Sequence, residues 1–290
     1  MKFYINSSKA STICKINRYG NIVDETIYLW KKLDKLHYYE CEKKSKESGN
    51  FNETVEHKFQ TFKKDLDLQK TITEKVHTKT DIENVKKEME KLIDNNEKLS
   101  INEKNEFKKR IISNIRCEYG TKNEDKVVER NNFKDNNLKA HFLSHTFKHK
   151  KQNHVFTFVG KIDGKTEDGK LIEIKNRVKG FMFKIPKYEI CQVHIYMMMM
   201  KVKECELVEN YGNEQKITNI KFDKDFWNNE VVSIVENYCK NFINFLEDKK
   251  ECIRFLGMND TQKKRFVNDY FYRMNLSSTN VNTLENFGFI

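Results

Sequence analysis

The sequence has only one proline and ten glycines among its 290 residues, and long apolar runs are missing. A helix that crosses a bilayer needs about 18 or more consecutive apolar residues, so no membrane-spanning helix and no membrane partner are predicted. The amino terminus also lacks the basic and then apolar pattern of a signal peptide. We therefore expect an intracellular protein, located in the cytoplasm or the nucleus.

Seven cysteines are scattered along the chain without any C-x-x-C pair. Neither a zinc ribbon nor a disulfide framework is indicated, and reduced thiols are expected. His141, His145 and His149 recur at a spacing that would align them on a helix, but their neighbours Phe142 and Phe147 favour a strand. Because no cysteine or carboxylate completes a tetrahedral ligand set beside them, we do not predict zinc there.

Charge is what the sequence has in abundance. Its 54 Lys and Arg residues against 43 Asp and Glu give a net charge of +11, which suits a polyanionic partner and would steer nucleic acid toward the protein. Aromatic residues make up 12% of the chain, enough apolar mass to favour a folded protein. The length suits one large domain, or one domain that carries an insertion.

The amino-terminal segment is predicted to form two helices. Residues 5–15 combine several hydroxyl side chains with a short apolar run, which indicates a serine-capped helix, and residues 24–35 follow with Trp30 on an inward face. Two interpretations of Ser8 stay open: its hydroxyl caps the helix, or it lies at a phosphate.

Residues 40–108 shift in composition to Lys, Glu, Asn and Asp, with sparse apolar positions at helical spacing. Thr80-x-x-Glu83 and Ser100-x-x-Glu103 are typical of capping boxes. This segment is therefore predicted to be an inserted arm of amphipathic helices. Its charges suit a solvated face, with DNA clamping or oligomerisation as the alternative.

Helical spacing resumes at residues 107–115. Gly120 is expected to let the backbone turn, and Thr121 to cap a new helix that carries Glu124. Seen alone, Glu124 is an early-turn glutamate that suits a helix dipole.

Strands and helices are predicted for the rest of the chain. Apolar and polar residues alternate in a strand over 139–147 and in a β-hairpin whose strands are 155–162 and 171–175, with its turn at 167–169. Pro186 suits the beginning of the next helix. The remaining predicted elements are a helix over 187–201, strands over 205–211 and 216–222, a closing helix over 225–246, and a tail helix that contains Phe266, Tyr270, Phe271 and Tyr272.

The predicted hairpin carries the residues with the clearest chemistry. Because side chains alternate between the faces of a strand, Glu173 and Lys175 share one face, and Asp163 at the end of the preceding strand can reach it. Two carboxylates offer oxygen ligands to a hard divalent cation, and an amine beside them can act on the water that the cation activates. The pattern is typical of metal-dependent phosphodiester cleavage, although ordinary surface charges on an exposed hairpin would look the same. Gln192 and Tyr196, four residues apart, share one face of the following helix.

Several of these segments, in this order, resemble the motifs of nucleases related to RecB and lambda exonuclease, within the restriction-endonuclease-like, or PD-(D/E)xK, superfamily. The matching motifs are Gly160-x-x-Asp163-Gly164, Glu173-x-Lys175 and Gln192-x-x-x-Tyr196. Two further segments resemble the YqaJ-type viral recombinase branch: Tyr119-Gly120-Thr121-x-x-Glu124, and Ser8-x-Ala10-x-x-Ile13-x-x-Ile16-Asn17-x-Tyr19. Lys15 and Arg18 stand where that branch usually has glycine and proline, and no arginine stands just upstream of Ser8.

The resemblance covers residues 5–35 and about 109–246, and it implies an α/β fold. A restriction-endonuclease-like core, with a mixed central β-sheet flanked by helices, would carry an inserted helical arm and a C-terminal helical tail. The core would comprise residues 1–39 and 109–250, the helical insertion residues 40–108, and the C-terminal extension residues 251–290.

The resemblance also implies roles for the site residues. Asp163 and Glu173, with the backbone carbonyl of Ile174 and with Glu124 directly or through water, would bind one or two Mg²⁺ or Mn²⁺ ions. Lys175 would orient the attacking water. It would also deprotonate that water if its pKa were depressed from the ordinary value of ~10.4, and otherwise it would stabilise charge.

Gln192 completes the catalytic set that the resemblance implies, and the expected DNA-binding residues are Ser8, Lys15, Arg18 and Tyr196. The implied function is metal-dependent exonuclease digestion of linear duplex DNA, 5′ to 3′, in recombination, repair or viral DNA processing, with a single-strand annealing recombinase as a partner. A structure-specific or restriction-like endonuclease and a non-catalytic DNA-binding recombination protein on the same fold are the alternatives. The oligomeric state stays open between a monomer and a ring-shaped homotrimer.

Overall fold

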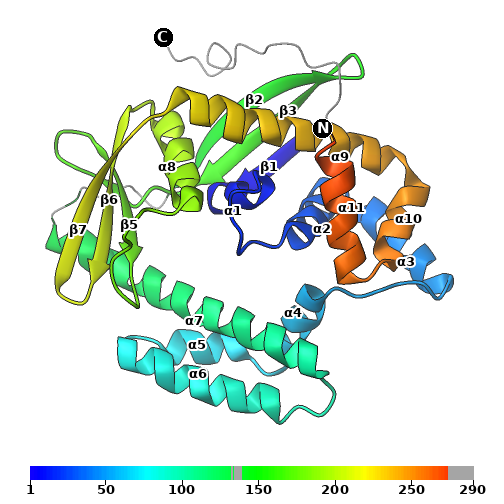
Figure 1. The fold of residues 1–290 in the computed structure, drawn as a ribbon, viewed down its shortest axis with the longest axis horizontal. Helices are drawn as coiled ribbons and strands as arrows, with labels where there is room; N and C mark the ends of the chain where they lie inside the picture. The colour runs from blue at the N-terminus through cyan, green and yellow to red at the C-terminus, as the bar shows by residue number, and fades with distance from the viewer. Residues whose placement is uncertain (132, 134–138, 274–290) are drawn as a thin grey trace.

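The computed structural model describes residues 1–131, 133 and 139–273 (Figure 1). These residues form eleven α-helices, one π-helix and seven β-strands, so the predicted mixed α/β class is confirmed. None of the helices in the described ranges combines the length and the hydropathy that crossing a bilayer requires.

The first sheet has three strands, β1 (Lys2–Asn6), β2 (His141–His149) and β3 (Gln152–Gly160), in the order β1-β3-β2. Strand β1 is parallel to β3, and β2 is antiparallel to it. The prediction of helix from residue 5 is wrong at its first two residues, because Ile5 pairs with Phe158 in the sheet and the helix begins only at Ser7. Both Ile5 and Phe158 are buried, so the sheet gains apolar burial that a helix at residue 5 would lose.

The second sheet has the order β4-β5-β6-β7. Its strands are β4 (Gly164–Lys165), β5 (Leu171–Asn176), β6 (Glu204–Tyr211) and β7 (Glu214–Lys221). The described strands thus form two mixed sheets rather than the expected single central sheet, and β5 pairs with the short β4 rather than with β3. Beyond the two β4 residues, the N–H of Ile174 donates to the Asp163 carboxylate at 2.7 Å. A side chain therefore takes the place that a longer partner strand would fill.

Helices cover both sheets and form the main core with the first. Figure 1 shows α9 crossing the first sheet and α8 lying between the two sheets. The bounds of these helices are α1 (Ser7–Ile13), α2 (Ile22–Leu33), α3 (Lys35–Glu47), α8 (Lys187–Met200), η1 (Phe226–Val232), α9 (Ser233–Glu247), α10 (Lys249–Gly257) and α11 (Asp260–Phe271).

Helix α8 is apolar on more than one face because it packs in two directions. Cys191, Ile195 and Met198 belong to the main core, whereas Val193 and Met197 belong to the core of the second sheet. A helix with no polar stripe is the expected form for an element buried on both sides. The run of methionines therefore fills core space, as predicted, and α8 joins the two sheets.

Four helices form the arm: α4 (Val55–Asp65), α5 (Leu68–Lys75), α6 (Lys79–Asp94) and α7 (Ile101–Arg130). They bury their own apolar cluster, which includes Phe59, Met89 and Phe107. The capping box of Ser100 and Glu103 is confirmed. The other predicted box is wrong by two residues, because Thr78 and Asp81 make the reciprocal bonds.

Helix α7 runs without a break through Gly120, so the predicted turn and the predicted cap at Thr121 are both wrong. Its thirty residues span about 45 Å at 1.5 Å per residue. A glycine inside a helix costs only about 1 kcal/mol, which burial of Tyr119 on one side and Val127 on the other can offset. One helix thereby reaches from the arm to the second sheet, where Val127 packs against Ile172 and Ile174.

The predicted domain boundaries fall within helices. Residue 40 lies in α3, residue 108 in α7 and residue 250 in α10. Cys41 of α3, Phe255 of α10 and Phe271 of α11 all belong to the main core. The described part of the predicted C-terminal extension therefore packs into that core, and residues 274–290 lie outside the described residues.

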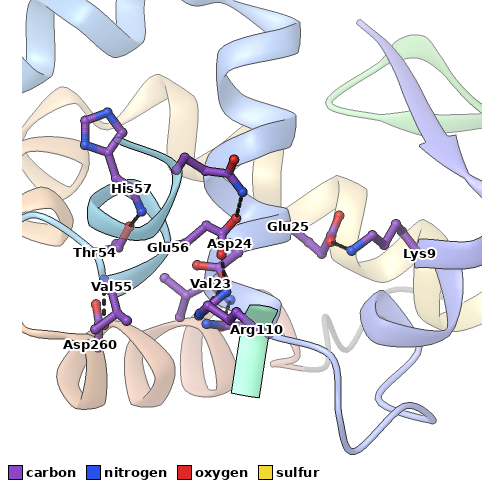
Figure 2. Close-up of polar contacts among 12 residues, drawn as sticks. Lys9, Val23, Asp24, Glu25, Thr54, Val55, Glu56, His57, Arg110 and Asp260 are labelled. Atoms are coloured by element: carbon purple, nitrogen blue, oxygen red, sulfur yellow. Dashed lines mark hydrogen bonds and ion pairs between the residues drawn. The ribbon is translucent and has the colours of Figure 1, made fainter. Parts of the chain in front are cut away.

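A charged network attaches the arm to the main core (Figure 2). Arg110 of α7 donates to Asp24 Oδ2 of α2 from both terminal nitrogens, each at 3.3 Å, and it also pairs with Glu56 of α4. The N–H of Val55 donates to Asp260 Oδ2 of α11 at 3.1 Å. Burial raises the pKa of Asp24 to about 7, although the Arg110 guanidinium opposes the shift. Arg110 therefore holds two carboxylates that would repel each other without it.

Arg110→Met should lower the free energy of unfolding by about 1–3 kcal/mol, because it leaves two carboxyl groups facing each other in a partly buried site. A carboxyl group with a raised pKa is tolerated while protonated and costs stability as the pH rises through that pKa, so the loss should be larger at pH 8 than at pH 5.5. Denaturant unfolding measures it. The matched control is Lys109→Met, whose side chain is 72% exposed and pairs with Glu106 on the same helix. Equal losses in both variants would contradict the role of Arg110.

Candidate active site

Four predicted site residues meet at the carboxyl end of β5. The Nζ of Lys175 donates to Glu173 Oε1 at 2.5 Å and to Gln192 Oε1 at 3.2 Å. Asp163, just before β4, accepts from the N–H of Ile174 at 2.7 Å. Glu173 and Lys175 share one face of β5, as strand alternation predicted. Residues from β5, α8 and the segment after β3 therefore form one group, which we call the carboxylate–lysine group.

Glu173 is the most buried carboxylate of this group. It is 1% exposed, and its Oε2 makes no hydrogen bond within the described part of the chain. Burial, followed by the charge of Asp163, raises the pKa of Glu173 to about 8. Burial likewise raises the pKa of Asp163 to about 6, against the opposing charge of Lys175. A buried and a half-buried carboxyl group that both resist ionisation make a place where positive charge is stabilised.

Lys175 is held in its charged form. Burial alone would lower its pKa, but the carboxylates of Glu173 and Asp163 outweigh burial and raise the pKa above its ordinary value. Lys175 could act as the base that deprotonates the attacking water only if its pKa were depressed. Of the two expected roles, stabilisation of negative charge is the one that suits this environment.

Helix α7 brings Glu124 to the same group. Asn176 at the end of β5 donates to the carbonyl of Gly120 at 2.9 Å, which holds α7 against the strand. One helical turn later, Glu124 lies close enough to Glu173 and Lys175 for their charges to interact, and burial followed by Glu173 raises its pKa. The carboxylate–lysine group thus contains three carboxyl groups from three separate elements.

Gly160 allows a close approach behind the group. A Cβ at this position would lie 2.5 Å from Tyr196 Cε1 and 2.6 Å from Ser7 Oγ, so only glycine fits without displacement. Tyr196 also accepts a hydrogen bond from Gln192 Nε2 at 3.0 Å, which orients the glutamine. At 4% exposure Tyr196 has little surface left for contact with DNA.

The serine that faces this region is Ser7 rather than Ser8. Ser7 is 1% exposed and donates to the carbonyl of Val159 at 3.0 Å, whereas Ser8 is exposed. The prediction of a serine cap is also wrong, because the residue at the cap position is Asn6 and Ser8 lies within α1.

Lys15 and Arg18 are exposed just after α1. Lys15 has a φ of 59°, in the left-handed region that favours glycine. Its Nζ lies 4.1 Å from the ring centroid of Tyr272. Arg18 donates to Tyr19 Oη at 2.6 Å. Neither of these contacts involves the carboxylate–lysine group.

A buried ion cluster beside Lys175 was not predicted from the sequence. Arg177 pairs with both oxygens of Glu189, at 2.7 and 2.8 Å, and its Nε donates to Glu209 at 2.7 Å. Two sequence signals could have indicated it: Arg177 continues the alternation of Glu173 and Lys175, and Glu189 precedes Gln192 by one helical turn. The cluster joins β5, α8 and β6, and so helps to fix the position of Gln192 relative to Lys175.

The donor set of the group fits a hard divalent cation. Carboxylate and carbonyl oxygens are the ligands that Mg²⁺ and Mn²⁺ prefer, and Asp163, Glu173, Glu124 and the Ile174 carbonyl are of that kind. The buried Oε2 of Glu173 also supports a cation site. It has no hydrogen-bond donor among the described residues, and a bound cation would supply the missing partner.

A second cluster of ligand-type atoms has different chemistry. His37, Cys41 and Cys252 place their ligand atoms within 4.8 Å of one another, where α3 meets α10. Thiols and imidazole are softer ligands that do not suit Mg²⁺ or Mn²⁺. Trp30 Nε1 donates to His37 Nδ1 at 3.1 Å, which keeps the imidazole proton on Nε2, the nitrogen that faces Cys41. Metal binding through Nε2 would need the proton on Nδ1 instead.

No protein-family model and no curated protein matches the sequence. Among solved structures, the crystal structure of SSO0001 is similar to this chain at 15% sequence identity and a TM-score of 0.33. The similarity covers 51% of this chain and 70% of that chain. Likeness at this level indicates neither a fold family nor an activity, so the side chains of the site must support any functional proposal.

Asp163→Asn should be more stable than the wild-type chain at pH 8, in the presence of EDTA, by about 1–3 kcal/mol, at about 1.4 kcal/mol per unit of pKa shift. The variant keeps an acceptor for the Ile174 N–H and removes one buried charge. Because the raised pKa values favour the protonated carboxyls in the folded state, the contribution of these two groups to wild-type stability is greatest below their unfolded pKa values. It falls as the pH rises through about 6 for Asp163 and about 8 for Glu173.

Denaturant unfolding between pH 5 and pH 8 measures this difference, which should grow with pH. The matched control is Asp168→Asn, because Asp168 is exposed in the turn before β5 and its pKa is lowered rather than raised. A wild-type chain that stays as stable as Asp163→Asn at pH 8 would show that the buried carboxyls are not strained.

Gly160→Ala should lower the free energy of unfolding by about 1–3 kcal/mol, because its methyl group overlaps Tyr196 and Ser7. Gly120→Ala is the control, and it should raise the free energy of unfolding. A Cβ added at Gly120, inside α7, would have open space around it. The gain there should be about 0.5–1 kcal/mol, since alanine is the better helix former. Thermal and denaturant unfolding measure both, and a harmless Gly160→Ala would disprove the close approach.

Proposed function

We propose that the chain is a divalent-cation-dependent nuclease that hydrolyses phosphodiester bonds of linear duplex DNA as an exonuclease. On this proposal its core is a restriction-endonuclease-like fold of the lambda-exonuclease and YqaJ type. The observation that carries the proposal is the carboxylate–lysine group, in which the Lys175 ammonium pairs with Glu173 and interacts through charge with Asp163 and Glu124. The net charge of +11 supports a polyanionic substrate.

Asp163 and Glu173, with Glu124 and the Ile174 carbonyl, would hold Mg²⁺ or Mn²⁺. A bound cation of this kind supplies Lewis-acid stabilisation of charge on a phosphoryl oxygen and makes a bound water more acidic. The Ile174 N–H donates to one oxygen of Asp163, which fixes the orientation of this carboxylate. Glu173 is fixed in the same way, through Lys175 at Oε1, with Oε2 left available.

Lys175 contributes a fixed positive charge beside these oxygens. An ammonium group has three N–H donors, and Glu173 and Gln192 take two of them. The third can donate to a phosphoryl oxygen or to the attacking water. Since its pKa is raised, Lys175 orients the water and stabilises the negative charge that develops on phosphate, rather than removing a proton.

Gln192 and Tyr196 act as positioning residues. The Gln192 amide accepts from Lys175 through oxygen and donates to Tyr196 Oη through nitrogen. Because Tyr196 is packed against Gly160, the amide has one orientation, and the lysine ammonium is held in turn. Exposed Lys15 and Arg18 are the residues proposed to contact DNA phosphates outside the group.

The wild-type chain should digest an end-labelled linear duplex in Mg²⁺ or Mn²⁺ and should stop when EDTA is added. Lys175→Met and Asp163→Asn should each lower the rate by about 10²-fold or more, as loss of a transition-state charge contact does. Two controls match them in residue type: Lys170→Met and Asp168→Asn, both exposed near the turn before β5, should digest at close to the wild-type rate. Wild-type activity in Lys175→Met would contradict the assigned role.

A covalently closed circle of the same sequence, incubated in the same tube, separates the alternatives. Digestion of the linear duplex alone supports the exonuclease. Cutting of the circle favours a structure-specific or restriction-like endonuclease. If neither substrate is cut by the wild-type chain while DNA is bound, the protein is a non-catalytic DNA-binding protein and the proposal fails.

A further inference from the structure

The segment from Arg177 to Pro186, between β5 and α8, presents a large aromatic side chain to solvent. Phe183 is 105% exposed, more than any other large apolar side chain in the described ranges. An exposed phenylalanine does not gain the hydrophobic stabilisation that usually buries this residue inside a protein. Single exposed apolar residues are common, so the surroundings of Phe183 must decide whether it has a function.

The segment is held in place just before its tip at Phe183. The backbone N–H of Met182 donates to Glu209 Oε1 at 2.9 Å, and Lys216 Nζ donates to the Met182 carbonyl at 2.7 Å. The ring of Phe181 packs edge-on against Tyr211, with centroids 6.0 Å apart. Phe183 therefore extends from a backbone that is tied to β6 and β7, so little ordering is needed before it contacts a ligand.

This anchoring places the tip beside the carboxylate–lysine group. Glu209, which binds the Met182 N–H, is the direct neighbour of Lys175 in the parallel register of β5 and β6. Glu209 also accepts from Arg177, two residues after Lys175. The segment begins directly after Asn176, the last residue of β5 and the neighbour of Lys175, and it leads into α8, whose second turn carries Gln192. Phe183 thus lies on the connection between two residues of the site.

The chemistry around Phe183 is basic and aromatic. Residues 176–188 contain no Asp or Glu, and Lys179 and Lys184 are exposed on either side of the tip. A second exposed aromatic, Tyr19, packs edge-on against Tyr188 in the first turn of α8, with ring centroids 6.2 Å apart. Exposed aromatic rings between lysines are the arrangement by which proteins hold unpaired nucleotides, with rings stacked on bases and cations on phosphates.

We propose that Phe183 stacks on a base of an unpaired nucleic-acid strand beside the carboxylate–lysine group, while Lys179 and Lys184 neutralise the flanking phosphates. The inference rests on the proposed function for its choice of substrate. A duplex keeps its bases stacked on each other, so a lone ring can engage them only where a strand is unpaired or frayed. Phe183 is therefore a substrate-specificity residue that selects unpaired ends, with no part in the bond-breaking step.

Phe183→Ala tests the inference by binding rather than by cleavage. A fluorescein-labelled single-stranded DNA 12-mer, titrated in EDTA at low salt and followed by fluorescence anisotropy, should bind about 5- to 150-fold more weakly to the variant, the range known for base–aromatic stacking. Phe183→Tyr keeps the ring and should bind as the wild type does. A duplex with both ends closed by hairpin loops of hexaethylene glycol offers no unpaired base, and its affinity should be unchanged in Phe183→Ala.

The matched control is Leu36→Ala, which removes another large apolar side chain that is 78% exposed, on α3 in place of the β5–α8 connection. Because the Phe183 side chain is fully exposed in the described part of the chain, the melting temperature of Phe183→Ala should equal that of the wild type, so weaker binding would not reflect unfolding. The inference is overturned if Phe183→Ala binds the 12-mer as tightly as the wild type does. It is also overturned if the variant loses as much affinity for the closed duplex as for the 12-mer.

The outcome is independent of the nuclease assay. If the wild-type chain cuts no DNA but Phe183→Ala still loses affinity for the 12-mer, the proposed function fails and the stacking role stands. If the wild-type chain digests DNA and Phe183→Ala keeps full affinity, the stacking role alone fails.

Discussion

Glu173 and Lys175 lie at alternate positions of β5, Arg177 continues this alternation just after the strand, and a charge in a protein interior is costly unless a partner compensates it. The partner residues come from the helices and the strand that pack against β5. Glu124 comes from α7, Glu189 and Gln192 from α8, and Glu209 from β6. The second sheet and the helices against it therefore have to converge on β5, because any one of them moving away would leave a buried charge unpaired.

The same constraint links the arm to the site through one helix. Arg110 lies in the first half of α7 and joins the arm to α2, while Glu124 lies in the second half and joins the carboxylate–lysine group. A continuous helix transmits a tilt along its whole length, so a shift of the arm relative to the main core also shifts Glu124. The arm is thus mechanically part of the site, although its apolar cluster is separate from the main core.

Local patterns in the sequence predicted what local physics decides. The strands predicted over residues 139–147 and 205–211 follow from a side-chain period of two and correspond to β2 (His141–His149) and β6 (Glu204–Tyr211). The capping box of Ser100 and Glu103 follows from contacts within one helical turn. The shared face of Glu173 and Lys175 follows from strand alternation. The same alternation predicted that Asp163 can reach this face, whereas the grouping of Glu124 and Gln192 with it was expected only from the resemblance of five motifs in order.

The amino-acid sequence by itself determined the periodic elements, the basic surplus and the alternation that puts Glu173 and Lys175 side by side, because these depend on residues a few positions apart. Only the tertiary structure decided that β5 pairs with β4, that α7 continues through Gly120, that Ser7 rather than Ser8 faces Gly160, and that Arg177 has two buried partners. Each of these depends on burial and pairing between segments far apart in the chain. A glycine continues a helix, or an aspartate side chain replaces a strand, only when distant residues supply the contacts that offset the local cost.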